Sequence, residues 1–114
     1  MSLDVSLMVT KPVSIYDANI THNLGAMARE CMVGPNGLTL YAVLWRPDEN
    51  ELMYASEIIE FLDEGYNNLL SHPERFKKFN PPNGWGTYEG LLSFVLKYKK
   101  ACMENPDAVL EVSR

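Results

Sequence analysis

The chain has 114 residues, of which 46% are hydrophobic and 22% are charged. This length suits one domain, and the composition is that of an ordinary globular protein, which excludes disordered, fibrous and disulfide-dense classes. The formal net charge of −5 argues against broad binding to a nucleic-acid backbone, although a local basic patch stays open. No apolar run has the roughly 20 residues that cross a bilayer, and no signal peptide is visible, so we expect a soluble protein without membrane contact.

The alternation of apolar and polar residues over 4–15 predicts a strand that Lys11 and Pro12 interrupt. Apolar residues three to four apart over 20–31 then predict a helix with Asn19 or Thr21 as its N-cap. The segment 38–45 is too short for periodicity to decide, and we favour a strand or a single helical turn.

Two further helices are predicted with clearer boundaries. One opens at Ser56 and stops before Pro73, and the other follows Thr87 as its N-cap and ends before Asn105. A short helical turn is expected over 74–79, and a last strand beside the first over 109–112. Residues 4–114 therefore predict a single α+β domain with about three main helices packed on a small two- to three-stranded sheet, and residues 1–3 are set aside as a possible cloning remnant.

The two cysteines, Cys31 and Cys102, fall on the apolar faces of the predicted helices and lie in no metal-ligand spacing. We therefore expect buried free thiols and a cytoplasmic protein. We also predict no metal site, because Asp17 and His22 have no third ligand at a recognisable spacing.

The first candidate site is a polar cluster at the predicted strand-to-helix junction, formed by Asp17, Asn19, His22 and Asn23. If Asn19 is the cap, the helix dipole keeps the ring of His22 neutral near pH 7, where it could act as a general base or bind a metal. The alternative is structural, because Asp and Asn are common turn and capping residues before a helix.

The second and third candidates are aromatic and basic. Trp85 lies between two glycines and precedes Tyr88, and an aromatic ring on such a loop can stack on a planar or sugar-like ligand, unless it only closes the end of the core. Arg46 has no basic neighbour in the sequence and could bind a carboxylate or a phosphate, unless it pairs with an acid of the following segment.

Charge is unevenly distributed along the chain. Residues 48–64 carry seven acids and no base, whereas residues 75–100 carry six bases and one acid. These stretches could drive homo-oligomer formation, or they could be the solvated faces of neighbouring helices. Residues 75–79 interleave basic and aromatic side chains as single-strand binders do, but the overall acidity makes nucleic acid an improbable partner.

Three segments, YDANITHNL at 16–24, LWRP at 44–47 and NGWGTYE at 83–89, resemble a family of short proteins met in bacteria and their phages. The resemblance runs over 13–114. It implies a bacterial or phage cytoplasmic protein, and it carries no catalytic role, cofactor or substrate.

Three functional hypotheses follow. The first is a small accessory module that binds a small polar or anionic ligand in a pocket formed by the three candidate sites. The second is a hydrolase or transferase with His22 as general base, with Asp17 orienting it or binding a metal, and with Arg46 holding an anionic substrate. The third is a structural protein that self-associates through the acidic and basic stretches.

Overall fold

The computed structural model describes residues 2–8 and 14–114. Three antiparallel strands form a sheet in the order β2-β1-β3, with β1 at Ser2–Met8, β2 at Ser14–Thr21 and β3 at Val109–Ser113. The predicted last strand is confirmed beside the first, with Val5 paired to Val112. The alternation read as one interrupted strand covers two strands that pair with each other, and the interruption itself lies outside the described residues.

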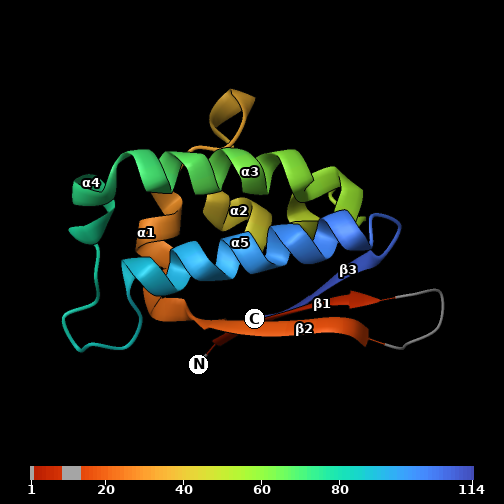
Figure 1. The fold of residues 1–114 in the computed structure, drawn as a ribbon, viewed down its shortest axis with the longest axis horizontal. Coiled ribbons are helices and arrows are strands. Elements are labelled where there is room, and N and C mark those ends of the chain that lie inside the picture. Colours follow the sequence, from red (N-terminus) through yellow and green to blue (C-terminus); the bar gives the residue numbers. More distant parts are fainter. Residues whose placement is uncertain (1, 9–13) are drawn as a thin grey trace.

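Two helices of 17 residues, α3 (Ala55–Ser71) and α5 (Tyr88–Glu104), lie side by side over the sheet (Figure 1). The shorter helices are α1 (Gly25–Arg29), α2 (Leu40–Trp45) and α4 (Pro73–Lys77). The α+β class is therefore confirmed. Within the described ranges, no helix combines the length and the apolarity that spanning a membrane requires.

The first predicted helix differs from the observed structure. Strand β2 continues through Asn19 to Thr21, and only then does the chain turn through the 3-10 helix η1 (His22–Leu24) into α1. Thr21, the second of the two predicted caps, accepts a hydrogen bond from the backbone N–H of Asn23 at 3.3 Å. Asn19 pairs with Asp4 in the sheet instead.

Helix caps account for most of the other boundaries. Thr87 accepts a hydrogen bond from the N–H of Gly90 at 3.0 Å, as predicted. Helix α3 begins one residue before Ser56, because the carboxylate of Glu57 accepts hydrogen bonds from the N–H groups of Met53 at 2.9 Å and Tyr54 at 2.8 Å. These backbone hydrogen bonds lower the pKa of Glu57. Residues 38–45, left open between strand and helical turn, form α2 with Thr39 as its cap.

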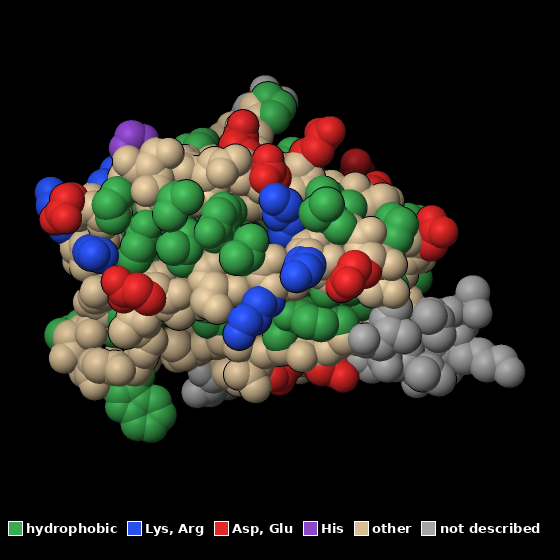
Figure 2. Space-filling view, in the orientation of Figure 1, with side chains coloured by type: hydrophobic (Ala, Val, Ile, Leu, Met, Phe, Trp, Pro, Cys, Tyr) green, Lys and Arg blue, Asp and Glu red, His purple; other side chains and the backbone are tan. Residues whose placement is uncertain are grey.

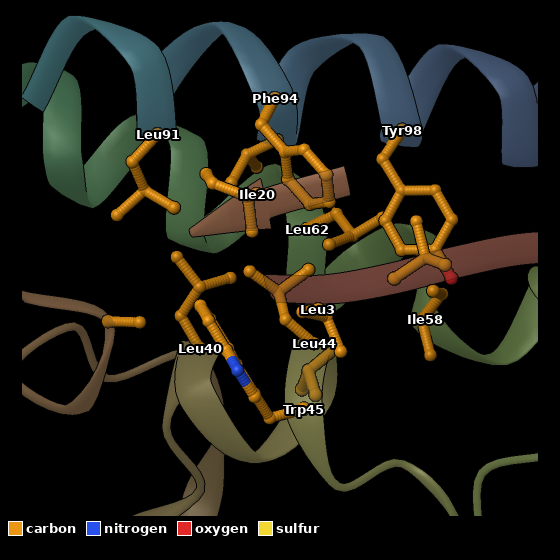
Figure 3. Packing of buried hydrophobic residues seen from close by; sticks show 14 of the residues in the cluster. Leu3, Ile20, Leu40, Leu44, Trp45, Ile58, Leu62, Leu91, Phe94 and Tyr98 are labelled. Atoms are coloured by element: carbon orange, nitrogen blue, oxygen red, sulfur yellow. The ribbon is translucent and has the colours of Figure 1, made fainter. Parts of the chain in front are cut away.

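The core lies between the sheet and the helices (Figure 3). Strand β1 buries Leu3, Val5 and Leu7 on the face toward the helices, as a period of two requires. Phe94 and Tyr98 of α5 point toward this face. Ser2 and Leu3 belong to β1, so these two residues contribute to the fold.

The face formed by α3 and α5 carries hydrophobic side chains with charged ones among them (Figure 2). Lys99 of α5 contacts Asp63 of α3, with Nζ 2.7 Å from Oδ1. One member of the basic stretch therefore pairs with one member of the acidic stretch inside a single chain. This contact fits the interpretation of the two stretches as faces of neighbouring helices.

Helix α3 offers a matched pair of leucines for testing the core. Leu62 is fully buried, whereas Leu70 is 52% exposed. We expect Leu62→Ala to lower the free energy of unfolding by about 2–5 kcal/mol, because it removes apolar burial and leaves a cavity. Leu70→Ala should change it by no more than about 0.5 kcal/mol. Urea denaturation of both variants measures the difference, and equal losses would contradict this packing.

The cysteines give a second test. Cys31 and Cys102 are both buried free thiols, and burial raises the pKa of each to about 12. A disulfide reagent at pH 8 should therefore modify neither thiol in the folded protein and both in guanidinium chloride. Rapid labelling of either cysteine under native conditions would show that the structure around it opens locally.

Candidate functional site

A cavity of about 270 Å³ lies where η1, α1 and α2 meet the end of β3. Its lining is polar, cationic and aromatic: His22, Gly25, Arg29, Tyr41, Trp45, Arg46 and Arg114. Three of the four arginines of the chain therefore line one cavity, which we call the arginine cavity. Because guanidinium groups bind carboxylates and phosphates, this concentration points to an anionic ligand.

Helix α2 supplies an aromatic wall to this cavity. Tyr41 and Trp45 are four residues apart and so share a helix face, and their rings stack at 5.1 Å between centroids with 12° between planes. The guanidinium of Arg29 lies 3.9 Å from the centroid of the Tyr41 ring. This cation–π contact holds Arg29 in place. Among the described residues no carboxylate lies within ion-pair distance of Arg29.

The other two arginines are already paired. Arg114 binds Asp48 in a bidentate way, with N–O distances of 2.8 and 3.0 Å, and it also donates to the backbone oxygen of Trp45 at 3.2 Å. Arg46 donates to Glu49 at 2.9 Å. The predicted alternative for Arg46, an ion pair with an acid of 48–64, is therefore present in the structure, although Arg46 also lines the cavity.

Three guanidinium groups face two carboxylates here, so one positive charge is left in excess. The nearby arginines shift the pKa values of Asp48 and Tyr41. Hydrogen bonds from Arg114 lower the pKa of Asp48. Desolvation alone would raise the pKa of Tyr41, but hydrogen bonds and charge from Arg46 and Arg29 outweigh it, and the net pKa is lowered. The surroundings of Tyr41 therefore favour negative charge.

His22 is the first residue of η1, not the third residue of a longer helix, so the predicted dipole argument does not apply to it. Its ring lies 6.1 Å from that of Trp45. The Nε2 atom is buried and has no hydrogen-bond partner among the described residues. An unpartnered buried polar atom costs about 1–3 kcal/mol, which a ligand or a small rotation of the ring could recover.

A second cavity of about 520 Å³ also has His22 in its lining. It is lined by uncharged polar side chains and one aromatic ring: Ser2, Asn19, Thr21, His22, Asn23 and Trp85. We call it the tryptophan cavity. Four of the predicted site residues, Asn19, His22, Asn23 and Trp85, therefore come together here, while Arg46 lies in the neighbouring cavity.

The loop that carries Trp85 is fixed to η1. Asn23 donates from Nδ2 to the backbone oxygen of Trp85 at 3.3 Å, and the N–H of Trp85 donates to Oδ1 of Asn83 at 3.0 Å. Gly86 has a φ of 106°, and a Cβ on it would lie 2.7 Å from Cγ2 of Thr21. Only glycine permits this approach. Trp85 itself stays 71% exposed, so it does not close the core.

Two predicted site residues lie elsewhere. Asp17 is on β2 and accepts a hydrogen bond from Ser6 at 2.7 Å, and it lines neither cavity. Tyr88 is buried, and its hydroxyl donates to the backbone oxygen of Leu69 at 2.5 Å, which joins α5 to the end of α3. Tyr88 therefore belongs to the core and does not line the predicted ligand pocket, because the face of α5 that carries it points into the core.

The basic-aromatic segment 75–79 is also occupied by structural contacts. Phe76 is fully buried and offers no ring for stacking on a base. Arg75 and Lys77 lie 3.6 and 3.7 Å from Glu30 and Glu89. Over 2–8 and 14–114, no three metal-ligating side chains gather in one place.

Sequence reasoning missed Arg29, Tyr41 and Arg114. Tyr41 and Trp45 carried a signal, because a spacing of four residues would have put them on one face if 38–45 had been assigned to a helix. Arg29 and Arg114 carried none, since tertiary packing alone brings them to Arg46.

No protein-family model, curated protein or solved structure matches this chain. The resemblance to a bacterial and phage family, carried by 16–24, 44–47 and 83–89, stays a prediction. The chemistry of the two cavities is therefore the basis for inferring function.

Gly84 and Gly86 offer a matched test of the Trp85 loop. Both have positive φ, but only at Gly86 would a Cβ meet other atoms. We expect Gly86→Ala to displace the loop and lower the melting temperature clearly more than Gly84→Ala, which carries backbone strain alone. Thermal unfolding followed by tryptophan fluorescence measures both effects. Equal shifts would mean that Gly86 does not seat the loop.

Proposed function

We propose that the protein is a small binding module for an anionic ligand, which the arginine cavity holds through Arg29, Arg46 and Arg114. The observation that carries the proposal is the convergence of three arginines from separate parts of the chain on one cavity. Guanidinium groups donate paired hydrogen bonds to the oxygens of phosphate or carboxylate. Tyr41 and His22 line the same cavity and add further polar atoms around such an anion.

Arg29 is the principal ligand contact in this proposal. Arg46 already donates a hydrogen bond to Glu49, and Arg114 donates to Asp48. Arg29 packs against Tyr41 and has no carboxylate partner among the described residues. The donors of Arg29 that do not bond to Tyr41 are therefore open to an incoming anion. Gly25 lies beside this guanidinium, and a Cβ there would be 3.4 Å from Nη1 of Arg29.

Catalysis is not part of the proposal. The enzyme hypothesis needs Asp17 beside His22, but Asp17 hydrogen bonds to Ser6 and lines neither cavity. The buried free thiols and the family resemblance favour a reducing compartment such as the bacterial cytoplasm.

Arg29→Gln should weaken the binding of inorganic phosphate by roughly 10-fold or more, because a charge-assisted hydrogen bond is lost. Arg75→Gln is the matched control, since Arg75 is the one arginine outside the cavity. Isothermal titration at low ionic strength gives both affinities, and added salt should weaken binding to the unchanged protein.

A second readout uses the two tryptophans. In a Trp85→Phe background, fluorescence reports Trp45 alone, at the wall of the arginine cavity. Phosphate should change this signal in the Arg75→Gln protein but not in the Arg29→Gln protein. If Arg29→Gln binds phosphate as well as Arg75→Gln does, the arginine cavity is not the anion site.

A further inference from the structure

We propose that the two cavities form one bipartite site for a phosphorylated sugar or nucleotide, with the anionic group in the arginine cavity and the ring of the ligand against Trp85. This inference rests on the anion-binding function proposed above and adds the class of ligand. The inference is argued from three observations: His22 lines both cavities, hydrogen bonds hold the backbone of the Trp85 loop, and the two cavities differ in charge.

His22 joins the two cavities because its imidazole lines both. A ligand whose parts occupy the two cavities therefore contacts His22 from both of them. The buried Nε2 atom has no partner in the described part of the chain, so a ligand that draws the ring toward itself adds a hydrogen bond without breaking one.

Trp85 offers an exposed stacking surface on a loop whose backbone is held by hydrogen bonds. Its side chain is 71% exposed, yet hydrogen bonds to Asn23 and Asn83 hold its backbone on both sides. A large exposed aromatic ring on a fixed loop has no role in the core. It resembles the aromatic platforms on which nucleobases stack, and such stacking tolerates many ring types.

The side chains of the tryptophan cavity indicate the class of the uncharged part of the ligand. Its other lining side chains are amides and hydroxyls, with Asn19 and Asn23 supplying both donors and acceptors. No charged side chain lines this cavity among the described residues. A neutral ring with hydrogen-bonding groups, either a sugar or a nucleobase, therefore fits here, while charge is directed to the arginine cavity.

Isothermal titration with inorganic phosphate, a ribose monophosphate and AMP tests the inference. We expect AMP, the ribose phosphate or both to bind roughly 10-fold or more tightly than phosphate. Trp85→Ala should remove this gain and leave the affinity for phosphate unchanged, and Trp85→Phe should keep most of it because a ring remains. A gain for AMP alone identifies a nucleobase on Trp85, and an equal gain for both compounds identifies the sugar.

The failure of this inference differs from the failure of the anion-binding function. If phosphate binds in an Arg29-dependent way but neither compound binds more tightly, or if the gain survives Trp85→Ala, the bipartite site is overturned and the anion site stands. If phosphate binding is absent or is insensitive to Arg29→Gln, the anion-binding function fails, whatever Trp85 does. Unchanged thermal unfolding of Trp85→Ala verifies that the exposed side chain was removed without loss of the fold.

Discussion

The packing of α2 is the constraint on which both the core and the candidate site depend. Its six residues place Leu40 and Leu44 in the core and Tyr41 at the arginine cavity, and Trp45 serves both, with 3% of its surface exposed. A helix this short is not stable by itself in water, so tertiary contacts must hold it. Any change that loosens the core beneath α2 therefore moves the aromatic wall of the cavity. The stability of the fold and the proposed binding are therefore coupled through α2. Figure 3 shows the apolar side chains of α2 facing those of α5.

Electrostatics at the site are decided locally and not by the net charge. The protein carries −5 overall, but exposed charges more than about 8 Å away are largely screened at physiological ionic strength. Near the cavity, Asp48 and Glu49 hold two arginines in fixed positions and leave the third uncompensated. Because these side chains are already ordered, they lose less conformational entropy when an anion binds. The two acids therefore order the cavity, while the charge of Arg29 remains for the proposed anion.

The sequence predicted the helices and strands that local patterns define. It did not predict the contacts between segments that are distant along the chain. Caps and periodicity located α3, α5 and β3, because Thr87 and the spacing of apolar residues act within a few turns. They did not locate the end of β2, since pairing with β1 keeps Asn19 extended against its preference for a cap. At the site, the cluster around His22 and Trp85 was recognisable as polar and aromatic loop residues. Arg29 and Arg114 were not, because their meeting with Arg46 depends on how α1, α2 and β3 pack.

The composition of the two cavities supports the proposed binding function more directly than the enzyme hypothesis. A general base must reach a proton of the substrate and must be able to accept it, and guanidinium groups cannot. The remaining titratable groups are Tyr41, which arginines surround, and His22, whose Nε2 atom is buried. Asp17, the carboxylate that would have oriented His22, lies on β2 against Ser6. What the two cavities do supply is positive charge in one, neutral hydrogen-bonding groups with a tryptophan in the other, and a histidine that lines both. That combination suits the ligand that we propose, in which a charged part is joined to an uncharged ring.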